Sequence, residues 1–263
     1  MDLGLEGKRA LVCGASRGLG YAAARSFLAE GARVVIAARG KEALAGAAER
    51  LGRETGAAPI PIAADLVVER DRERLVGASI EALGGVDVVV LNTGGPPPGP
   101  FGSHGPDNWR LALELSLVSA AHLASLVLPE MRARGFGRIG QIVSIAGLEV
   151  VDGLILSNAS RPAALGFAKA LAREVAGDGV LVNSVCPGVF LTDRIRDLAR
   201  ERAASRGITE AEFIAEFCGD IPLGRPGEPS EVGDLLAFLC SPRNTYVTGA
   251  AIPIDGGKTR RLY

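Results

Sequence analysis

A loop of closely spaced glycines near the amino terminus is the part of the sequence best suited to binding a charged ligand. Gly14, Gly18 and Gly20 follow a short apolar run, Ser16 and Leu19 lie between them, and a helical pattern begins inside the loop. Glycines at such a junction let the backbone approach a pyrophosphate, whose charge is stabilised at the N-terminus of the helix. The loop therefore predicts a dinucleotide-binding site. The alternative is a tight turn between strand and helix that binds no ligand.

The elements around this loop alternate along the whole chain between short apolar runs and longer helical patterns. The apolar runs are apolar on both faces, as expected for a parallel sheet covered by helices on each side. The predicted strands are residues 9–13, 33–38, 59–64, 86–91, 139–144, 180–185 and 250–254. The predicted helices are residues 18–30, 41–54, 68–83, 107–134, 158–177 and 229–240. This alternation predicts one α/β domain over residues 1–263, a doubly wound parallel sheet of about seven strands with right-handed crossovers.

Residues 190–224 are the least regular part of the chain, with two short helical patterns and no strand. A long excursion after a strand's carboxyl end usually covers the ligand crevice of an open α/β sheet, so we expect a substrate lid here. Its arginine surplus is typical of a solvated helix face and is also compatible with an anionic substrate such as a carrier-bound acyl thioester. Apolar residues at helical spacing would form its underside: Phe190, Ile195, Leu198, Phe213 and Phe217.

The composition argues against several classes of protein. The 263 residues carry 29 basic and 30 acidic side chains, and a formal net charge of −1 argues against a protein that binds nucleic acid. The sequence has neither a run of 18 consecutive apolar residues, as a membrane span would need, nor a signal-peptide pattern. Four cysteines without a CxxC pair and two histidines argue against a zinc site. We therefore expect a cytoplasmic protein with reduced thiols, no bound metal and no membrane span.

Motifs spread over residues 5–257 resemble those of the short-chain dehydrogenase/reductase family, in that family's order and spacing. The loop CGASRGLG is similar to the family's TGxxxGxG loop, with Cys13 in place of the usual threonine. Asp65 and Leu66 stand where the family has an adenine-contacting aspartate, although Asp65 could also serve as a helix cap. The remaining matches are Asn92, Thr93, Gly94 and Gly95 for the NNAG segment, Asn183, Cys186, Pro187, Gly188 and Thr192 for the stretch that holds the nicotinamide, and the closing Asp255, Gly256 and Gly257. The resemblance implies a Rossmann-like fold, and the chain is similar to 3-oxoacyl-[acyl-carrier-protein] reductase-like members.

Charge near the adenosine end favours NADP(H), with NAD(H) as the weaker candidate. An acid at the end of the second strand would bind the ribose 2′-hydroxyl and repel a 2′-phosphate, but this sequence has Ala38 there, followed by Arg39. Arg17 lies inside the glycine loop. Two guanidinium groups suit a 2′-phosphate through charge-assisted, bidentate hydrogen bonds. The alternative is that both arginines are solvated surface charges.

Three of the four catalytic positions that the resemblance implies are replaced. The family has a serine that polarises the carbonyl, a tyrosine that transfers the proton, a lysine that lowers the tyrosine pKa and an asparagine that supports a water relay. Ser144 matches the serine, but Ser157, Arg161 and Ser116 stand at the other positions. A serine hydroxyl is far too weak an acid to replace tyrosine near pH 7, and Arg161 keeps its proton. Ser157 could instead cap the following helix, and bound water or His104 could supply the proton.

Two functions from different classes remain open. The first is an NADP(H)-dependent oxidoreductase that interconverts a carbonyl and an alcohol on a small-molecule substrate, with a 3-oxoacyl thioester among the candidates and Ser144, Ser157 and Arg161 as catalytic residues. The second is a catalytically silent NADP(H)-binding sensor or partner subunit on the same fold. A methyltransferase is disfavoured by the glycine spacing and the paired arginines. Since family members commonly pair the helices that match residues 107–134 and 158–177, we expect a homo-oligomer, a tetramer or dimer.

Overall fold

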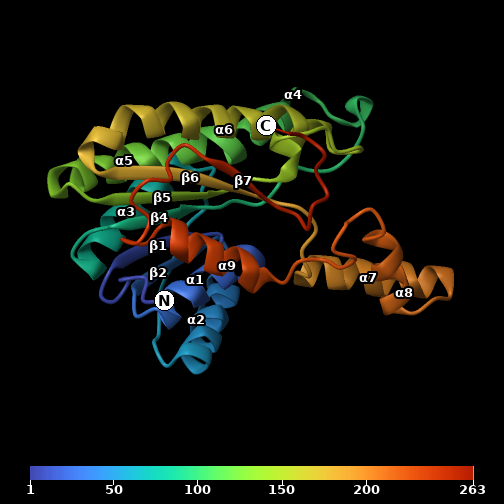
Figure 1. Cartoon of the computed structure of the whole chain (residues 1–263), viewed down its shortest axis with the longest axis horizontal. Helices are drawn as coiled ribbons and strands as arrows, with labels where there is room; N and C mark the ends of the chain where they lie inside the picture. The colour runs from blue at the N-terminus through green and yellow to red at the C-terminus, as the bar shows by residue number, and fades with distance from the viewer. Residues whose placement is uncertain (263) are drawn as a thin grey trace.

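The computed structural model describes residues 1–262, which form a seven-stranded parallel sheet covered by helices on both faces (Figure 1). The strands lie in the order β3-β2-β1-β4-β5-β6-β7, which confirms the predicted fold class. Their bounds are β1 Arg9–Cys13, β2 Arg33–Ala38, β3 Ile60–Ala63, β4 Val88–Leu91, β5 Gly137–Ile142, β6 Val180–Pro187 and β7 Ala251–Ile254. The strand order reverses between β1 and β4, and a ligand crevice in such sheets lies outside the carboxyl ends at this point.

Alternation along the strands builds a separate core on each face of the sheet. In β1, Leu11 and Cys13 belong to the core under α3, α5 and α6, whereas Ala10 and Val12 belong to the core under α1, α2 and α9. These layers are visible above and below the sheet in Figure 1. The helices are α1 Gly18–Ala29, α2 Lys41–Thr55, α3 Glu69–Leu83, α4 Pro106–Leu113, α5 Ser119–Arg134, α6 Ile155–Val175, α7 Asp193–Arg206, α8 Glu210–Phe217 and α9 Pro229–Leu239.

The segment predicted as one helix over residues 107–134 is two helices joined by a π-helical turn, Glu114–Val118. Such turns insert one residue into the helical register and are frequent at functional sites. By length and composition alone, the run Pro106–Arg134 is long and apolar enough to cross a membrane. Within the fold, however, this run covers the sheet, and Leu123 and Val127 of α5 lie in the core.

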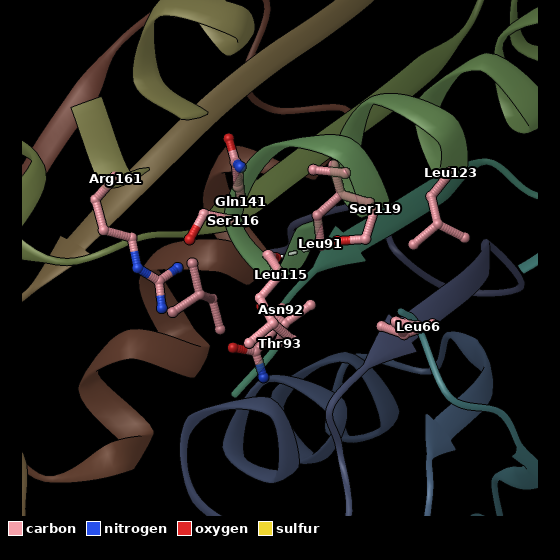
Figure 2. A pocket seen from close by; sticks show the side chains of 12 residues that line it. Leu66, Leu91, Asn92, Thr93, Leu115, Ser116, Ser119, Leu123, Gln141 and Arg161 are labelled. Carbon is pink, nitrogen blue, oxygen red and sulfur yellow. Dashed lines mark hydrogen bonds between the residues drawn. The ribbon is translucent and has the colours of Figure 1, made fainter. Parts of the chain in front are cut away.

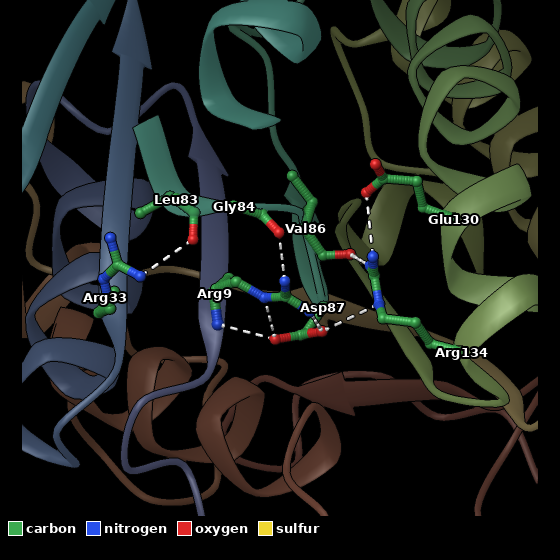
Figure 3. Close-up of polar contacts among 8 residues, drawn as sticks. All are labelled: Arg9, Arg33, Leu83, Gly84, Val86, Asp87, Glu130 and Arg134. Carbon is green, nitrogen blue, oxygen red and sulfur yellow. Dashed lines mark hydrogen bonds and ion pairs between the residues drawn. The ribbon is translucent and has the colours of Figure 1, made fainter. Parts of the chain in front are cut away.

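A charged cluster joins the amino ends of β1 and β4, away from the crevice (Figure 3). Arg9 Nε donates to Asp87 Oδ2 at 2.8 Å, and the Arg9 backbone N–H donates to the same oxygen at 3.1 Å. Arg134 of α5 donates to the Val86 carbonyl at 2.7 Å, and its Nε lies 3.5 Å from Asp87 Oδ1. Burial alone would raise the pKa of Asp87, but the hydrogen bonds and charge of Arg9 outweigh it and lower that pKa. The cluster fixes this end of the sheet and leaves the carboxyl ends free for a site.

Candidate functional site

The glycine loop after β1 has the geometry of a phosphate cradle. Gly14 and Gly18 adopt φ angles of +61° and +62°, a region that side chains disfavour. A Cβ on Gly20 would lie 2.3 Å from the Gly14 carbonyl oxygen, so only glycine fits there. At the N-terminus of α1 the N-cap residue is Arg17, whose side chain makes no capping bond. The residues present therefore fit a pyrophosphate, which the uncapped helix end would bind.

Two other strands, β4 and β6, bring further predicted site residues to this loop. Asn92, after β4, donates from Nδ2 to the carbonyl oxygens of Cys13 and Gly14, both at 3.3 Å. Thr192, beyond β6, packs against the loop, since a Cβ on Gly18 would lie 3.6 Å from its Cγ2 atom. The order of the sheet thus gathers residues that lie far apart in the sequence at one point.

Arginine side chains surround the outer edge of the glycine loop. Arg17 and Arg39 are exposed, and neither guanidinium makes a hydrogen bond or ion pair within residues 1–262. Arg50 of α2, which sequence reasoning missed, donates to the Ser16 carbonyl at 3.4 Å and stacks over the Tyr21 ring at 5.4 Å. Its position in α2 looks like that of any solvated helical arginine, so the sequence carries no signal for it. The corner where a 2′-phosphate would lie is strongly cationic.

The Asp65–Leu66 segment is held in place by residues of α3. Asp65 accepts a hydrogen bond from the Val67 backbone at 3.2 Å, so its carboxylate shapes the turn before α3. The N-cap of α3 is Val68, so the alternative in which Asp65 caps this helix is wrong. Its own N–H donates to Asp71 Oδ2 at 2.7 Å. The buried Arg72 donates to the Leu66 carbonyl at 2.6 Å, which fixes the backbone beside the crevice.

The residues from Asn183 to Gly188, in β6 and directly after it, have structural roles. Asn183 is buried, donates to the Val247 carbonyl at 2.8 Å and accepts from the Ala250 N–H at 3.2 Å, so its amide joins β6 to the segment before β7. The resemblance placed Asn183 in the stretch that holds the nicotinamide, whereas in the structure its amide is used to join two segments of the chain. Pro187 ends β6, and a Cβ on Gly188 would lie 2.8 Å from the Asp255 Cβ. Gly188 is therefore required by the close approach of the chain after β7.

Ser144 and Ser157 come from two elements that meet at the crevice. Ser144 follows β5, is half-buried, and accepts a hydrogen bond from the Ala146 N–H at 3.1 Å. Helix α6 begins earlier than predicted, at Ile155, and its N-cap is Leu154. The alternative in which Ser157 caps this helix is therefore wrong. Within the described part of the chain the Ser157 hydroxyl makes no hydrogen bond, which leaves it available to water or substrate.

Arg161 lies one turn beyond Ser157 and extends from α6 into a cavity, as Figure 2 shows. Its side chain is only 7% exposed, and burial lowers the pKa of Arg161 from its ordinary value. The Nε atom is buried and meets no acceptor among residues 1–262. A Cβ on Gly147 would lie 3.3 Å from the Arg161 Cβ, and a Cβ on Gly95 would lie 3.8 Å from the Arg161 Nη2. The guanidinium thus lies between the turn after Ser144 and the loop after β4.

The polar lining of this cavity includes two residues, Ser119 and Gln141, that the sequence analysis did not single out. Thr93 Oγ1 donates to the Leu115 carbonyl at 2.8 Å and thereby joins β4 to the π-helical turn. Ser116 is buried in that turn, with its Oγ 3.0 Å from the Ser160 Oγ. Gln141 is buried within β5. Gln141 could have been predicted as a site residue, because a polar side chain is unusual in a predicted strand that is buried on both faces.

His104 lies on the loop that follows β4. The Gly99 N–H of this loop donates to the Gly153 carbonyl at 2.7 Å, which brings the loop to the start of α6. The His104 Nε2 is buried and has no hydrogen-bond partner within the described chain. The second histidine, His122, accepts from Arg72 Nε at 3.0 Å and lies with Glu69 and Glu73 on the α3–α5 surface, outside the cavity.

Helices α7 and α8 project from the body of the molecule (Figure 1). The two short helical patterns predicted for this region are thus present. The rings of Phe213 and Phe217 stack with centroids 5.7 Å apart, whereas Phe190 is buried in the core under α1, α2 and α9. Phe217 is still 38% exposed. Arg206 pairs with Glu216 at 2.8 Å, which agrees with a solvated helix face for part of the arginine surplus.

Comparisons with known proteins agree with this geometry. A family model described as enoyl-(acyl carrier protein) reductase matches residues 14–259. A putative ketoacyl reductase of Streptomyces coelicolor is 34% identical over 250 residues, which cover 94% of this chain and 95% of that protein. The L-sorbose reductase of Gluconobacter frateurii, solved with NADPH and L-sorbose, has a TM-score of 0.96 and 32% identity over 100% of both chains. An NADPH-bound short-chain oxidoreductase from Pseudomonas aeruginosa PAO1, described as containing an atypical catalytic centre, has a TM-score of 0.88 and 28% identity over 96% of this chain and 97% of that one.

Proposed function

This chain belongs to the short-chain dehydrogenase/reductase family, and we propose on that premise that it interconverts a carbonyl compound and the corresponding alcohol with NADP(H) as cofactor. The observation that carries the proposal is the uncapped glycine cradle with Arg17, Arg39 and Arg50 around it, in a fold that matches the NADPH-bound sorbose reductase over its full length. Membership of the family makes the chain an oxidoreductase, and what we propose is the reaction, the interconversion of a carbonyl and an alcohol.

The cofactor would lie across the carboxyl ends of the sheet. In this proposal the glycine loop binds the pyrophosphate, the arginines bind the 2′-phosphate, and Asp65 and Leu66 contact the adenine. Asn92, Gly94, Pro187, Gly188 and Thr192 line the nicotinamide half. Bound there, NADPH would supply a hydride for the carbonyl carbon, and a proton from solvent would complete the alcohol.

The chain's own residues then have to orient the carbonyl and deliver that proton. Ser144 donates a hydrogen bond to the carbonyl oxygen. Ser157 is smaller than the tyrosine it replaces, so it leaves room for a water molecule that its hydroxyl and Ser144 would hold. Neither Ser157 nor Arg161 can lose a proton near pH 7, and water is no stronger an acid, so the proton comes from bulk solvent. The bound water would relay it, giving one proton to the substrate oxygen and regaining one from solvent. The Ser116–Ser160 pair, with oxygens 3.0 Å apart, supports the proposal because it offers the water a hydrogen-bonded path inward.

A catalytically silent NADP(H)-binding protein is the second candidate, because serine and arginine replace the family's tyrosine and lysine. The test combines NADPH oxidation, followed by absorbance, with fluorescence titration of NADPH binding. We expect oxidation with at least one member of a panel of ketones, quinones and acyl thioesters. Ser144→Ala should lower turnover at least tenfold and leave NADPH affinity within twofold, whereas the exposed control Ser125→Ala should change neither. Tight binding of NADPH without turnover on any carbonyl or alcohol would favour the silent protein.

We also propose that residues 190–224 form a substrate lid and that the protein is a cytoplasmic homo-oligomer, in particular a tetramer. Apolar side chains on the surface of the α4–α5 run support the assembly: Leu111, Leu113 and Val118 are 38%, 43% and 43% exposed. Such a patch is normally covered by a partner. Light scattering at micromolar concentration should give the mass of a tetramer or dimer, and a monomer would contradict the assembly.

A further inference from the structure

A buried positive charge without a negative partner is the most unusual feature of the cavity. The Arg161 guanidinium is 7% exposed and takes part in no hydrogen bond or ion pair within residues 1–262. Buried charges are ordinarily paired, because burial without a partner is strongly unfavourable. A guanidinium carries five N–H donors and cannot lose its charge in a protein. An arginine kept in this state is suited to a ligand that brings the missing charge.

The side chains around Arg161 offer hydrogen-bond acceptors but no negative charge. The polar residues that line the cavity with it are all neutral: Asn92, Thr93, Ser116, Ser119 and Gln141. Asp255, whose charge acts on the Cys186 thiol, accepts hydrogen bonds from the backbone of Gly257 and Thr259 at 2.9 and 2.8 Å. It is therefore engaged in the turn after β7. The ribose of a bound cofactor would add hydroxyl acceptors and, being neutral, would also leave the charge uncompensated.

A second cation acts on the same thiol as Arg161. Burial raises the pKa of the Cys186 thiol to about 11, and the charges of Arg261 and Arg161 both oppose that rise. Arg261 is exposed and comes from the segment after β7. One edge of the Arg161 guanidinium is also accessible, because Gly95, the residue beside Nη2, is exposed and has no side chain.

We propose that Arg161 binds the carboxylate of the substrate, so that the preferred substrates are oxo acids. This inference rests on the proposed function and names its substrate class. The planar fork of a guanidinium matches a planar carboxylate through two parallel hydrogen bonds. The replacement of tyrosine by Ser157, one turn before Arg161 on the same face of α6, leaves space for this group beside the carbonyl that Ser144 orients.

Matched substrates separate this proposal from carbonyl reduction in general. The probes are 2-oxopentanoate and 4-oxopentanoate, which carry a carboxylate, and 2-pentanone, which does not. We expect kcat/KM for at least one of the acids to exceed that for 2-pentanone at least 100-fold. In Arg161→Gln this preference should fall below tenfold, and Arg161→Lys should restore part of it. Arg173→Gln, which changes an exposed arginine on the same helix, should keep the full preference.

A binding measurement provides a readout that does not depend on turnover. Calorimetric titration of the NADP⁺-loaded protein with the two acids should detect binding, which Arg161→Gln should weaken at least 30-fold and Arg173→Gln should not change. NADP⁺ affinity is measured separately for each variant. If 2-pentanone is reduced as well as the acids and Arg161→Gln leaves the preference unchanged, the substrate class is wrong and the proposed function stands. If the acids bind through Arg161 but no carbonyl is reduced, the proposed function fails and the binding site stands. If the acids neither bind nor react, this inference is overturned.

Discussion

Replacement of Arg161 by methionine should make the ligand-free protein more stable. Methionine fills a similar elongated space and favours a helix interior, but it brings no charge into the cavity. Replacement of buried ionic groups by apolar ones of similar volume can stabilise a protein by about 1–4 kcal/mol. With an unfolding entropy of about 2.1 cal/mol/K per residue, 263 residues give about 0.55 kcal/mol/K. The expected rise in Tm is therefore about 2–7 °C.

The assay is thermal unfolding followed by circular dichroism, with and without NADPH. The matched control is Arg173→Met, on the exposed side of α6, for which we expect a change in the free energy of unfolding within about 0.5 kcal/mol. Arg161→Met should at the same time lose binding of oxo acids, since residues kept for function are often locally destabilising. If Arg161→Met instead lowers Tm by several degrees while Arg173→Met has no effect, the guanidinium stabilises the fold. The argument for an uncompensated charge would then be refuted.

Three further substitutions test other parts of the molecule. Arg39→Asp should reverse most of an at least tenfold preference for NADPH over NADH in fluorescence titrations, because it places a negative charge beside the 2′-phosphate; equal affinities in the unchanged protein would contradict this. Asp87→Asn should lower the free energy of unfolding by about 2–3 kcal/mol at pH 7. Because the pKa of Asp87 is lowered below its unfolded value of 3.8, its contribution is complete above that pH and is lost as pH falls below it, so urea titrations of the two proteins should converge there. The double variant Ser157→Tyr/Arg161→Lys should raise the reduction of neutral ketones by about 10²–10⁴-fold if the tyrosine fits the cavity, and loss of all activity would show that it does not.

Strands with unambiguous apolar patterns could be predicted from the sequence to the residue. Arg9–Cys13 and Arg33–Ala38 agree with the structure at both ends. The start of α6 could not be predicted, since its N-cap is Leu154 and no polar cap marks it. Instead, Asn158 holds the preceding loop through two hydrogen bonds with the Val151 backbone, at 3.0 and 2.9 Å. Because Asn158 lies inside α6, its hydrogen bonds to the preceding loop do not mark the residue at which the helix begins.

The sequence predicted the parts of the site that depend on backbone conformation. It did not predict which side chains the tertiary structure buries there. The glycine loop needs positive φ at Gly14 and Gly18, and the sequence states this directly. The burial of Arg161 has no signal, because arginine is mostly exposed in proteins and the helical pattern of α6 is the same in either case. The π-helical turn that buries Ser116 is likewise hidden, since the sequence ELSLV fits a regular helix equally well.

Transfer of deuterium from the cofactor is the most direct test of the central claim that this chain is an oxidoreductase with a working, altered site. The protein is mixed with an oxo acid and NADPH deuterated at C4 of the nicotinamide, separately in each of the two stereochemical forms, and the hydroxy acid is analysed by mass spectrometry. The account predicts one deuterium on the carbinol carbon from one form only, and at least tenfold less product with Ser144→Ala. Product without deuterium from either form, or bound NADPH that is never oxidised, would contradict it.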